Sequence, residues 1–272
     1  MKIESLLVTA MNAAAGAGEV INEIYTSNQP QTTYKSDDSP LTVADIKSQE
    51  IISEYLQDSG LPMLSEEDTK VPFSTRKYWE YYWLVDPLDG TKEFVKRNGE
   101  FSVNIALMQN NSPLAGIIYI PVKRIVYWSV PGDGVYKLQI KELNNFRIKN
   151  LTQLKKQASR LPFEKKRKNI IVVTSRSFKS AETEQYILML KEKHPDTRLI
   201  ATGSAVKFGL IAEGTADVYP RFAPTMEWDV AAGHALLNEL GYSVTSVLTG
   251  QSLFYNKPDL SNPWFIAKNN RL

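Results

Sequence analysis

Apolar residues recur at helical spacing in the first sixty residues. From residue 3 to residue 24 they fall mostly three or four positions apart, which predicts an amphipathic helix that ends before Asn28-Gln29-Pro30. The segment Thr42-Val43-Ala44-Asp45 has the spacing of a capping box, with an acid at the third helical position. A second helix should therefore begin there, run to about Gln57 and stop near Gly60.

β-Branched and aromatic residues dominate the middle of the chain. Two apolar runs, Leu61-Pro62-Met63-Leu64 and Trp79 to Val85, have the composition of buried strands. Four more β-rich runs follow, separated by turn sequences, and predict an antiparallel meander. These runs are Phe101–Met108, Pro113–Ile120, Ile125–Val130 and Val135–Ile140.

Strands and helices alternate in the last hundred residues. A polar and basic stretch from residue 150 to residue 169 precedes them, and we place a boundary there between an N-terminal α+β lobe (1–155) and a C-terminal α/β lobe (156–272). The alternating elements predict a largely parallel sheet flanked by helices. They comprise strands at 170–173, 198–201 and 216–219, and helices at 181–193, 204–213 and 230–240.

Composition narrows the class of protein. The chain has no cysteine, which excludes disulfides, thiolate metal sites and a cysteine nucleophile, and fits a reducing cytoplasm. A formal net charge of +2 argues against a nucleic-acid polymer as partner. We interpret the basic stretch at 150–169 as an exposed connector, because it lacks interleaved aromatics other than Phe163 and has no sustained helical pattern. No run approaches the roughly 18 apolar residues that span a bilayer, so no transmembrane segment is expected.

Two carboxylates end one of the apolar runs. Asp86 and Asp89, in Asp86-Pro87-Leu88-Asp89-Gly90-Thr91, follow the predicted strand directly. Like charges so close repel each other unless a cation neutralises them, so the loop suits a hard divalent metal. Pro87 cannot continue a hydrogen-bonded ladder and predicts a turn after Val85. Asp-Pro-x-Asp-Gly is also a common turn sequence, and that structural interpretation stays open on these residues alone.

Further acids fall at comparable places. Glu66 and Glu67 follow another predicted strand, and Asp229 precedes the apolar stretch 230–240, where it is either a helix cap or a ligand. Carboxylates with few histidines and no cysteine favour Mg²⁺, because hard cations prefer oxygen ligands. Neither His194 nor His234 is expected to be the catalytic base, since His234 lies five positions after Asp229 and the two do not share a helix face.

The acidic motifs together resemble those of the magnesium-dependent, lithium-sensitive phosphatases of the inositol monophosphatase superfamily. The resemblance spans nearly the whole chain, and its motifs are Ser65–Asp68, Trp83–Phe94 and Trp228–His234. Lys92-Glu93-Phe94 resembles the bacterial 3'(2'),5'-bisphosphate nucleotidase branch, and Lys96–Phe101 agrees with it. The resemblance implies a layered α/β/α/β/α sandwich with its metal site between the lobes.

The resemblance also implies roles for single residues. Two or more Mg²⁺ ions would be held by carboxylates and one backbone carbonyl, with Asp86 as the bridge: Glu66, Asp86, Leu88, Asp89 and Asp229. Asp45 with Thr91 would position and deprotonate the attacking water. From the sequence alone, Asp45 could equally be only a helix-cap acid.

Substrate binding would use both lobes. The scissile phosphate would lie at the metal ligands and be cradled by Gly90, Thr91 and Lys92. The phosphate that is not cleaved would meet Ser204, Lys207 and Arg221, which match positions used in related nucleotidases, although generic surface cations would give the same pattern.

The function implied is hydrolysis of adenosine 3',5'-bisphosphate to AMP and phosphate by metal-activated water, which removes a by-product of sulfate activation. In this branch a histidine commonly stands where this chain has Phe178, which leaves a polar contact there in question. An inositol or sugar monophosphate phosphatase, and a catalytically silent metal- or phosphate-binding protein, remain alternatives. The resemblance places the enzyme in the cytoplasm, with peripheral association at the inner membrane as a variant, and leaves its oligomeric state open.

Overall fold

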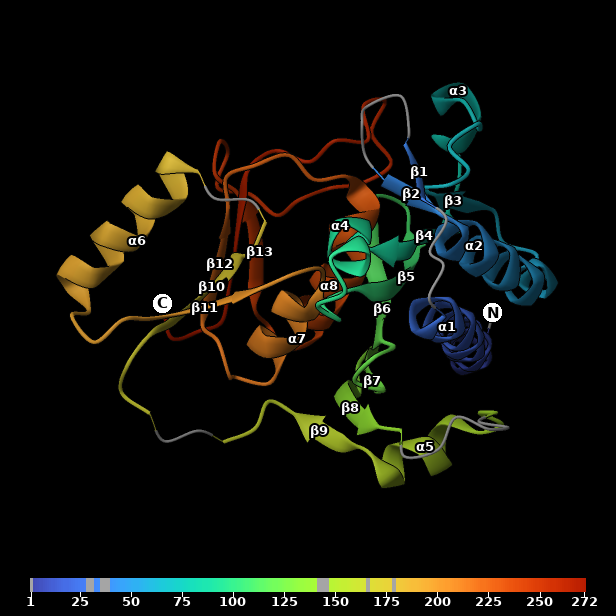
Figure 1. Cartoon of the computed structure of the whole chain (residues 1–272), viewed down its shortest axis with the longest axis horizontal. Helices are drawn as coiled ribbons and strands as arrows, with labels where there is room; N and C mark the ends of the chain where they lie inside the picture. The colour runs from blue at the N-terminus through green and yellow to red at the C-terminus, as the bar shows by residue number, and fades with distance from the viewer. Residues whose placement is uncertain (1, 28–31, 35–39, 141–146, 165–166, 178–179) are drawn as a thin grey trace.

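The computed structural model describes residues 2–27, 32–34, 40–140, 147–164, 167–177 and 180–272. Its secondary structure forms alternating layers (Figure 1), namely α1 and α2, a seven-stranded sheet, α7 and α8, a five-stranded sheet, and α6. The expected α/β/α/β/α sandwich is confirmed. The helices are α1 (Ile3–Thr26), α2 (Val43–Leu56), α3 (Phe73–Arg76), α4 (Thr91–Val95), α5 (Leu151–Gln157), α6 (Ala181–Lys193), α7 (Val206–Ala212) and α8 (Glu227–Glu239), with a 3₁₀ turn at Gln57–Ser59.

The two N-terminal helices form where the sequence predicts them. The Thr42 side chain accepts the Ala44 N–H, and the Asp45 carboxylate accepts the Thr42 N–H, so the capping box is confirmed. After the 3₁₀ turn, Gly60 takes the left-handed conformation with φ 67°. The buried faces of α1 and α2 pack on one side of the seven-stranded sheet, which forms the first core.

The seven-stranded sheet has its strands in chain order. They are β3 (Met63–Ser65), β4 (Tyr81–Asp89), β5 (Ser102–Gln109), β6 (Ser112–Ile120), β7 (Ile125–Val130), β8 (Gly134–Gln139) and β9 (Ser159–Leu161). The predicted meander is confirmed as β5 to β8, which pair antiparallel. β9 was not predicted: it pairs with β8 and extends this sheet beyond residue 155. A short hairpin, β1 (Thr32–Tyr34) with β2 (Pro40–Thr42), lies outside both sheets.

β4 differs from the prediction at both ends. It begins at Tyr81, not Trp79, and continues through the expected turn to Asp89. Asp86 pairs with Asn104 and Asp89 with Ser102, so Pro87 and Leu88 form a β-bulge between them. A proline fits a bulge because it has no N–H to donate to the ladder. The expected turn is therefore wrong, and a bulge delivers the two carboxylates instead.

The five-stranded sheet is mixed, with two parallel and two antiparallel pairings. Its order is β11 (Arg198–Thr202), β10 (Ile171–Ser175), β12 (Val218–Arg221), β14 (Phe265–Lys268) and β13 (Ser243–Ser246). β10 pairs parallel with both of its neighbours, while β14 runs antiparallel to β12 and β13. The prediction of a largely parallel sheet therefore holds only for β11, β10 and β12. β13 and β14 are short and were not predicted. α6 covers the outer face through a small apolar cluster.

α7 and α8 lie between the two sheets and share one apolar core with both of them. α8 begins at Glu227, three residues before the predicted start, so Asp229 stands in its first turn. α8 packs very closely on β6: a Cβ at Gly116 would lie 2.1 Å from the carbonyl oxygen of Ala232. α7 begins at Val206, two residues later than predicted, because Ser204 has φ 53° and cannot be helical.

None of the helices in the described part of the chain combines the length and apolar character that crossing a bilayer requires.

Candidate metal-dependent active site

A cavity of about 420 Å³ opens between the two sheets. The end of β4 and the start of α4 line one side, and the loop before α7, the end of β12 and the start of α8 line the other. All predicted metal ligands reach it, as do Gly90, Thr91, Lys92, Ser204, Lys207 and Arg221. The fold thus brings the sequence-predicted residues together, and Asp45 contacts the cavity-lining residue Thr91 through a hydrogen bond.

Strand pairing brings two of the acids together. β3 pairs parallel with β4, Ser65 is in register with Val85, and the Glu66 N–H donates to the Val85 carbonyl (3.1 Å). Glu66 therefore leaves β3 beside Asp86. Asp229 approaches from α8, and carboxylate oxygens of Glu66, Asp86 and Asp229 all lie within 4.8 Å of one another.

Asp86 is the buried centre of this acid cluster. Its Oδ1 accepts the Leu88 N–H (3.1 Å), whereas its Oδ2 has no hydrogen-bond partner among the described residues. Burial raises the pKa of Asp86 well above its ordinary value, and neighbouring carboxylates raise it further, Glu66 most strongly. A buried carboxylate oxygen with acids around it and no donor fits a hard divalent cation, which would supply the missing positive charge.

Asp89, which lies beside the cluster, and Asp229, which belongs to it, are held by hydrogen bonds. Oδ2 of Asp89 accepts from the Ser204 hydroxyl (2.8 Å), the Ala205 N–H (2.7 Å) and Asn104 (3.2 Å). Burial raises the pKa of Asp229 to about 8, and Asp89 and Glu66 add to the rise, although the Met226 N–H (2.9 Å) donates to its Oδ2 and opposes it. These hydrogen bonds fix the carboxylates in place, while burial and the repulsion between the acids favour a bound cation.

Asp45 and Thr91 form a pair next to the cluster. The Thr91 hydroxyl lies 3.1 Å from Oδ1 of Asp45 and 3.2 Å from the Leu88 carbonyl. Oδ2 of Asp45 accepts from both the N–H and the hydroxyl of Thr42. Burial raises the pKa of Asp45 to about 6, against the opposing effect of these hydrogen bonds. Asp45 is thus a helix-cap acid and also a group that can exchange a proton near neutral pH, so the two interpretations are compatible.

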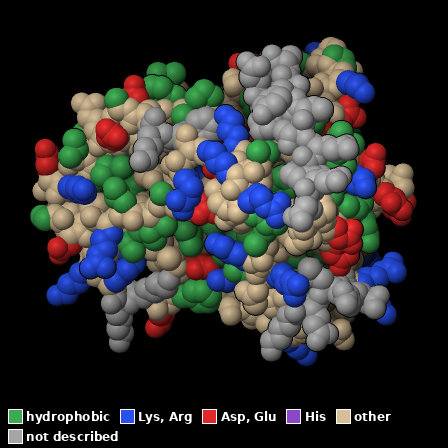
Figure 2. Space-filling model, viewed as in Figure 1, with side chains coloured by type: hydrophobic (Ala, Val, Ile, Leu, Met, Phe, Trp, Pro, Cys, Tyr) green, Lys and Arg blue, Asp and Glu red, His purple; other side chains and the backbone are tan. Residues whose placement is uncertain are grey.

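Two cations line the same side of the cavity as Asp229. Lys207 is buried, with Nζ 2.5 Å from the Ser204 carbonyl and 5.1 Å from the Tyr219 ring centroid. Burial lowers the pKa of Lys207 to about 8, although Asp89 opposes the shift. Arg221 is also buried and donates to the Pro224 carbonyl. Figure 2 shows Lys and Arg side chains gathered on the face that carries α4, whose first residues line the cavity.

Ser204 has a different setting from the one predicted. Its hydroxyl already donates to Asp89 and lies 2.5 Å from the Ser102 hydroxyl. Its side chain therefore supports an acid of the cluster directly. The proposed contact to substrate stays a prediction. Phe178, where the branch commonly has histidine, lies outside the described residues.

Sequence reasoning missed the polar contacts that join the two sides of the cavity. Glu93 of α4 is buried and accepts a hydrogen bond from Ser177. Glu100 receives Arg176 through two nitrogens (2.6 and 2.7 Å) and the Gly203 N–H (2.9 Å). The motif Lys92-Glu93-Phe94 was the available signal for Glu93, but nothing local in the sequence indicates its partner.

His234 lies apart from this chemistry. It is buried in α8 with Nδ1 2.8 Å from the Tyr255 hydroxyl, and burial lowers its pKa to about 4. A neutral histidine bound to a tyrosine has a packing role, in agreement with the sequence interpretation.

Comparison with known proteins agrees with the geometry. The model of the inositol monophosphatase family matches residues 2–271. The 3'(2'),5'-bisphosphate nucleotidase CysQ of Salmonella typhimurium is 40% identical over 264 residues, which cover 96% of this chain and 98% of that protein. CysQ of Escherichia coli K12 is also 40% identical, over 93% of this chain and 95% of that protein.

Solved structures give the same result. CysQ from Bacteroides thetaiotaomicron, a bacterial member of the inositol monophosphatase family, matches with a TM-score of 0.91 and 47% identity, covering 100% of this chain and 99% of that one. The extragenic suppressor protein suhB of Bartonella henselae, at 23% identity and a TM-score of 0.74 over 98% of this chain and 94% of that one, shares the fold. This chain belongs to the inositol monophosphatase family.

Proposed function

We propose that this protein is a Mg²⁺-dependent 3'(2'),5'-bisphosphate nucleotidase that hydrolyses adenosine 3',5'-bisphosphate to AMP and phosphate. The observation that carries the proposal is that one cavity holds both the acid cluster and the buried side chains of Lys207 and Arg221. A substrate with two phosphates matches such a cavity, because the acid cluster with its ions would bind one phosphate and the two cations the other. The nucleotidases of 40% identity support the same choice of substrate.

Glu66, Asp86, Asp89 and Asp229, with the Leu88 carbonyl, would hold two or more Mg²⁺ ions. All of these groups offer oxygen, the donor that Mg²⁺ prefers, and Oδ2 of Asp86 has no hydrogen-bond partner in the described part of the chain. When bound, such ions activate water and neutralise charge on the phosphoryl oxygens. The chain's own part is to hold these oxygens close together in the cavity wall before ions and substrate bind.

Asp45 and Thr91 would manage the proton of the attacking water. The Thr91 hydroxyl donates to Asp45, which leaves the Thr91 oxygen able to accept a hydrogen bond from water. A proton leaving that water passes to the Thr91 oxygen as the Thr91 hydroxyl proton passes to Asp45. A pKa of about 6 lets Asp45 accept a proton at neutral pH and release it again after turnover.

Lys207, Arg221 and Ser204 would meet the phosphate that stays on the nucleotide. Burial makes the charged form of Lys207 costly, and an anion bound beside it restores the favourable electrostatics. Gly90, Thr91 and Lys92 would surround the scissile phosphate at the start of α4. Location in the cytoplasm, peripheral membrane association and lithium inhibition stay predictions from the resemblance.

Phosphate release tests the proposal. Adenosine 3',5'-bisphosphate and inositol 1-phosphate should be compared at equal concentration, each with Mg²⁺ and with excess chelator, and Asp86→Asn purified in parallel excludes a contaminating phosphatase. We expect magnesium-dependent release from the bisphosphate with AMP as product. Preference for inositol phosphate would refute the assigned substrate but keep the metal chemistry, whereas no release from either would favour a binding protein.

A further inference from the structure

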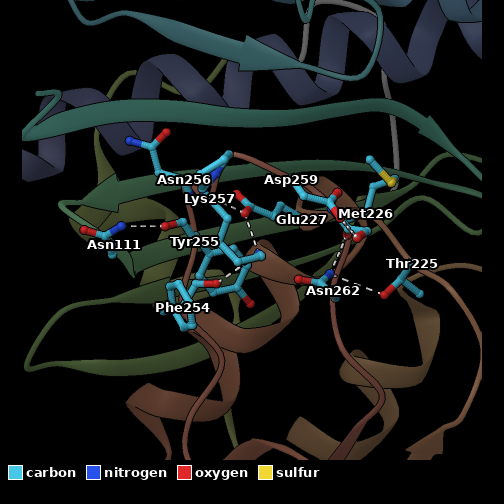
Figure 3. Close-up of polar contacts among 12 residues, drawn as sticks. Asn111, Thr225, Met226, Glu227, Phe254, Tyr255, Asn256, Lys257, Asp259 and Asn262 are labelled. Atoms are coloured by element: carbon cyan, nitrogen blue, oxygen red, sulfur yellow. Dashed lines mark hydrogen bonds and ion pairs between the residues drawn. The ribbon is translucent and has the colours of Figure 1, made fainter. Parts of the chain in front are cut away.

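Asp229 depends on the segment that begins α8. Its Oδ2 accepts the Met226 N–H (2.9 Å), and the Met226 carbonyl in turn accepts from Asn262 Nδ2 (2.7 Å). The Asn262 N–H donates to the Thr225 carbonyl (2.8 Å). Figure 3 shows Asn262 reaching both Thr225 and Met226. A loop of the C-terminal region, residues 254–262, therefore holds the residues that precede Asp229.

Glu227, two residues before Asp229, is fixed to the same loop. Its side chain is fully buried and accepts from the Asn256 N–H (2.7 Å), the Lys257 N–H (3.1 Å) and Lys257 Nζ (2.5 Å). The Glu227 N–H donates to the Leu260 carbonyl (2.9 Å). In Figure 3 Glu227 lies between Lys257 and Met226. Asn256 has φ 60°, an uncommon backbone conformation for a residue other than glycine.

The loop is anchored in turn to the N-terminal lobe. Arg76 of α3 is buried and donates to Asn256 Oδ1 (2.7 Å) and to the Lys257 carbonyl (2.5 Å), while Asn256 Nδ2 donates back to the Arg76 carbonyl (2.7 Å). Asn111, in the turn between β5 and β6, donates to the Tyr255 carbonyl (2.6 Å). The chain of contacts thus runs from the sheet that carries Asp86, through the loop, to Glu227.

We propose that Glu227 is a positioning residue, which sets Asp229 for metal binding by locking the start of α8 to the loop 254–262 and, through Arg76, to the N-terminal lobe. A buried ion pair adds little stability compared with apolar packing of the same volume, but the three hydrogen bonds of Glu227 hold the start of α8 at one place on the loop. Glu66 and Asp86 are set by direct strand pairing, but Asp229 arrives from another segment and needs a separate device to reach them. The inference rests on the metal site proposed above.

The test compares Glu227→Gln with a matched control, Glu213→Gln. Glu213 is likewise a mostly buried acid paired with a lysine, Lys137 (2.6 Å), and bound to the Tyr127 hydroxyl, but it lies at the far end of α7. Mg²⁺ affinity is measured by calorimetry without substrate, and the melting temperature in chelator. Both variants should lose thermal stability, but only Glu227→Gln should lose Mg²⁺ affinity, by about tenfold or more, as is usual for residues that support metal ligands.

Asn262→Ala gives an independent arm in case Glu227→Gln does not fold. It removes the hydrogen bond to the Met226 carbonyl without leaving a buried charge unpaired, and it should lower Mg²⁺ affinity several-fold while the control stays at the wild-type value. Wild-type affinity in both Glu227→Gln and Asn262→Ala, with only stability reduced, would overturn the positioning role. Absence of Mg²⁺ binding to the wild-type protein is a separate result, which would overturn the metal site itself and this inference with it.

Discussion

Replacing Asp86 by asparagine should stabilise the metal-free protein while it abolishes activity. Asparagine keeps the shape of the side chain, and its Oδ1 can still accept the Leu88 N–H. The Oδ2 that has no donor among the described residues becomes an NH₂ group, which can donate to the neighbouring carboxylates. The substitution therefore removes repulsion and adds hydrogen bonds, but it also removes the carboxylate that we propose as the central metal ligand.

The geometry sets the magnitude. Two full charges at the 4.8 Å limit that bounds the cluster repel by roughly 3.5 kcal/mol at an effective dielectric constant of about 20. Proton uptake limits this penalty, because burial and the neighbouring acids raise the pKa of Asp86. We expect a gain of about 1–3 kcal/mol in the free energy of unfolding without metal, which raises the melting temperature by several degrees. Mg²⁺ at a hundred times its dissociation constant should stabilise the wild type by about 2.7 kcal/mol and the variant not at all.

Thermal unfolding at pH 8, in chelator and in a Mg²⁺ series, measures both effects. Asp217→Asn is the matched control, because Asp217 is equally buried but bonded to Arg167 (2.5 Å) and Arg271 (3.2 Å). The same substitution there should lower stability by about 1.5–3 kcal/mol, since it removes charge-assisted hydrogen bonds from the partly buried Arg167 and the exposed Arg271. If Asp86→Asn lowers metal-free stability as Asp217→Asn does, the Asp86 carboxylate stabilises the bulge of β4 and the repulsion argument is wrong.

Three further outcomes are expected. Asp45→Asn should lower kcat by a factor of about 10² or more while Mg²⁺ binding in calorimetry stays at the wild-type value; a fall in Mg²⁺ affinity would instead make Asp45 part of the metal site. Lys207→Met should raise KM for adenosine 3',5'-bisphosphate by about tenfold or more and leave KM for adenosine 3'-monophosphate nearly unchanged, because one charge-assisted contact is lost; equal effects on both substrates would contradict the assignment. Burial tends to raise the pKa of Asp217, but hydrogen bonds from Arg167 and Asn269 outweigh it and hold that pKa below its ordinary value. On acidification the unfolded chain therefore takes up the proton first, so stability in an acid titration should hold above about pH 5 and fall below about pH 4. Asp217→Asn should flatten this fall.

The sequence was sufficient for features whose cause is local. The capping box at Thr42 and Asp45 formed as predicted because both partners lie within one helical turn. The meander followed from alternating β-rich runs and turn residues. The acids Glu66, Asp86 and Asp229 are too far apart in the chain for such a local cause, and they could be named as a group only because their motifs resemble those of one phosphatase superfamily.

The sequence was insufficient where the cause is a distant partner. Pro87 indicated the end of a strand, but only the register between β4 and β5 distinguishes a turn from a bulge. The hydroxyl of Ser204 could not be assigned to Asp89, from which it is separated by 115 positions. β9, β13 and β14 are three or four residues long, and their apolar pattern is too short to predict a strand.

The acids come from two parts of the fold: Glu66 directly follows β3 and Asp86 lies in β4, whereas Asp229 lies in α8. This division explains why hydrogen bonds from other segments are needed to hold the acids together. Repulsion between the carboxylates would push α8 away from β4 if the helix could move. The close backbone contact between Gly116 of β6 and Ala232 of α8 blocks movement of α8 toward the sheet, but not movement along it or away from it. Movement along or away from the sheet must be opposed by hydrogen bonds, and those of Glu227 and Asn262 lie at the end of α8 that carries Asp229. The acids are therefore held together without a cation, so a cation that binds there would spend its binding energy on charge neutralisation and not on assembling the site.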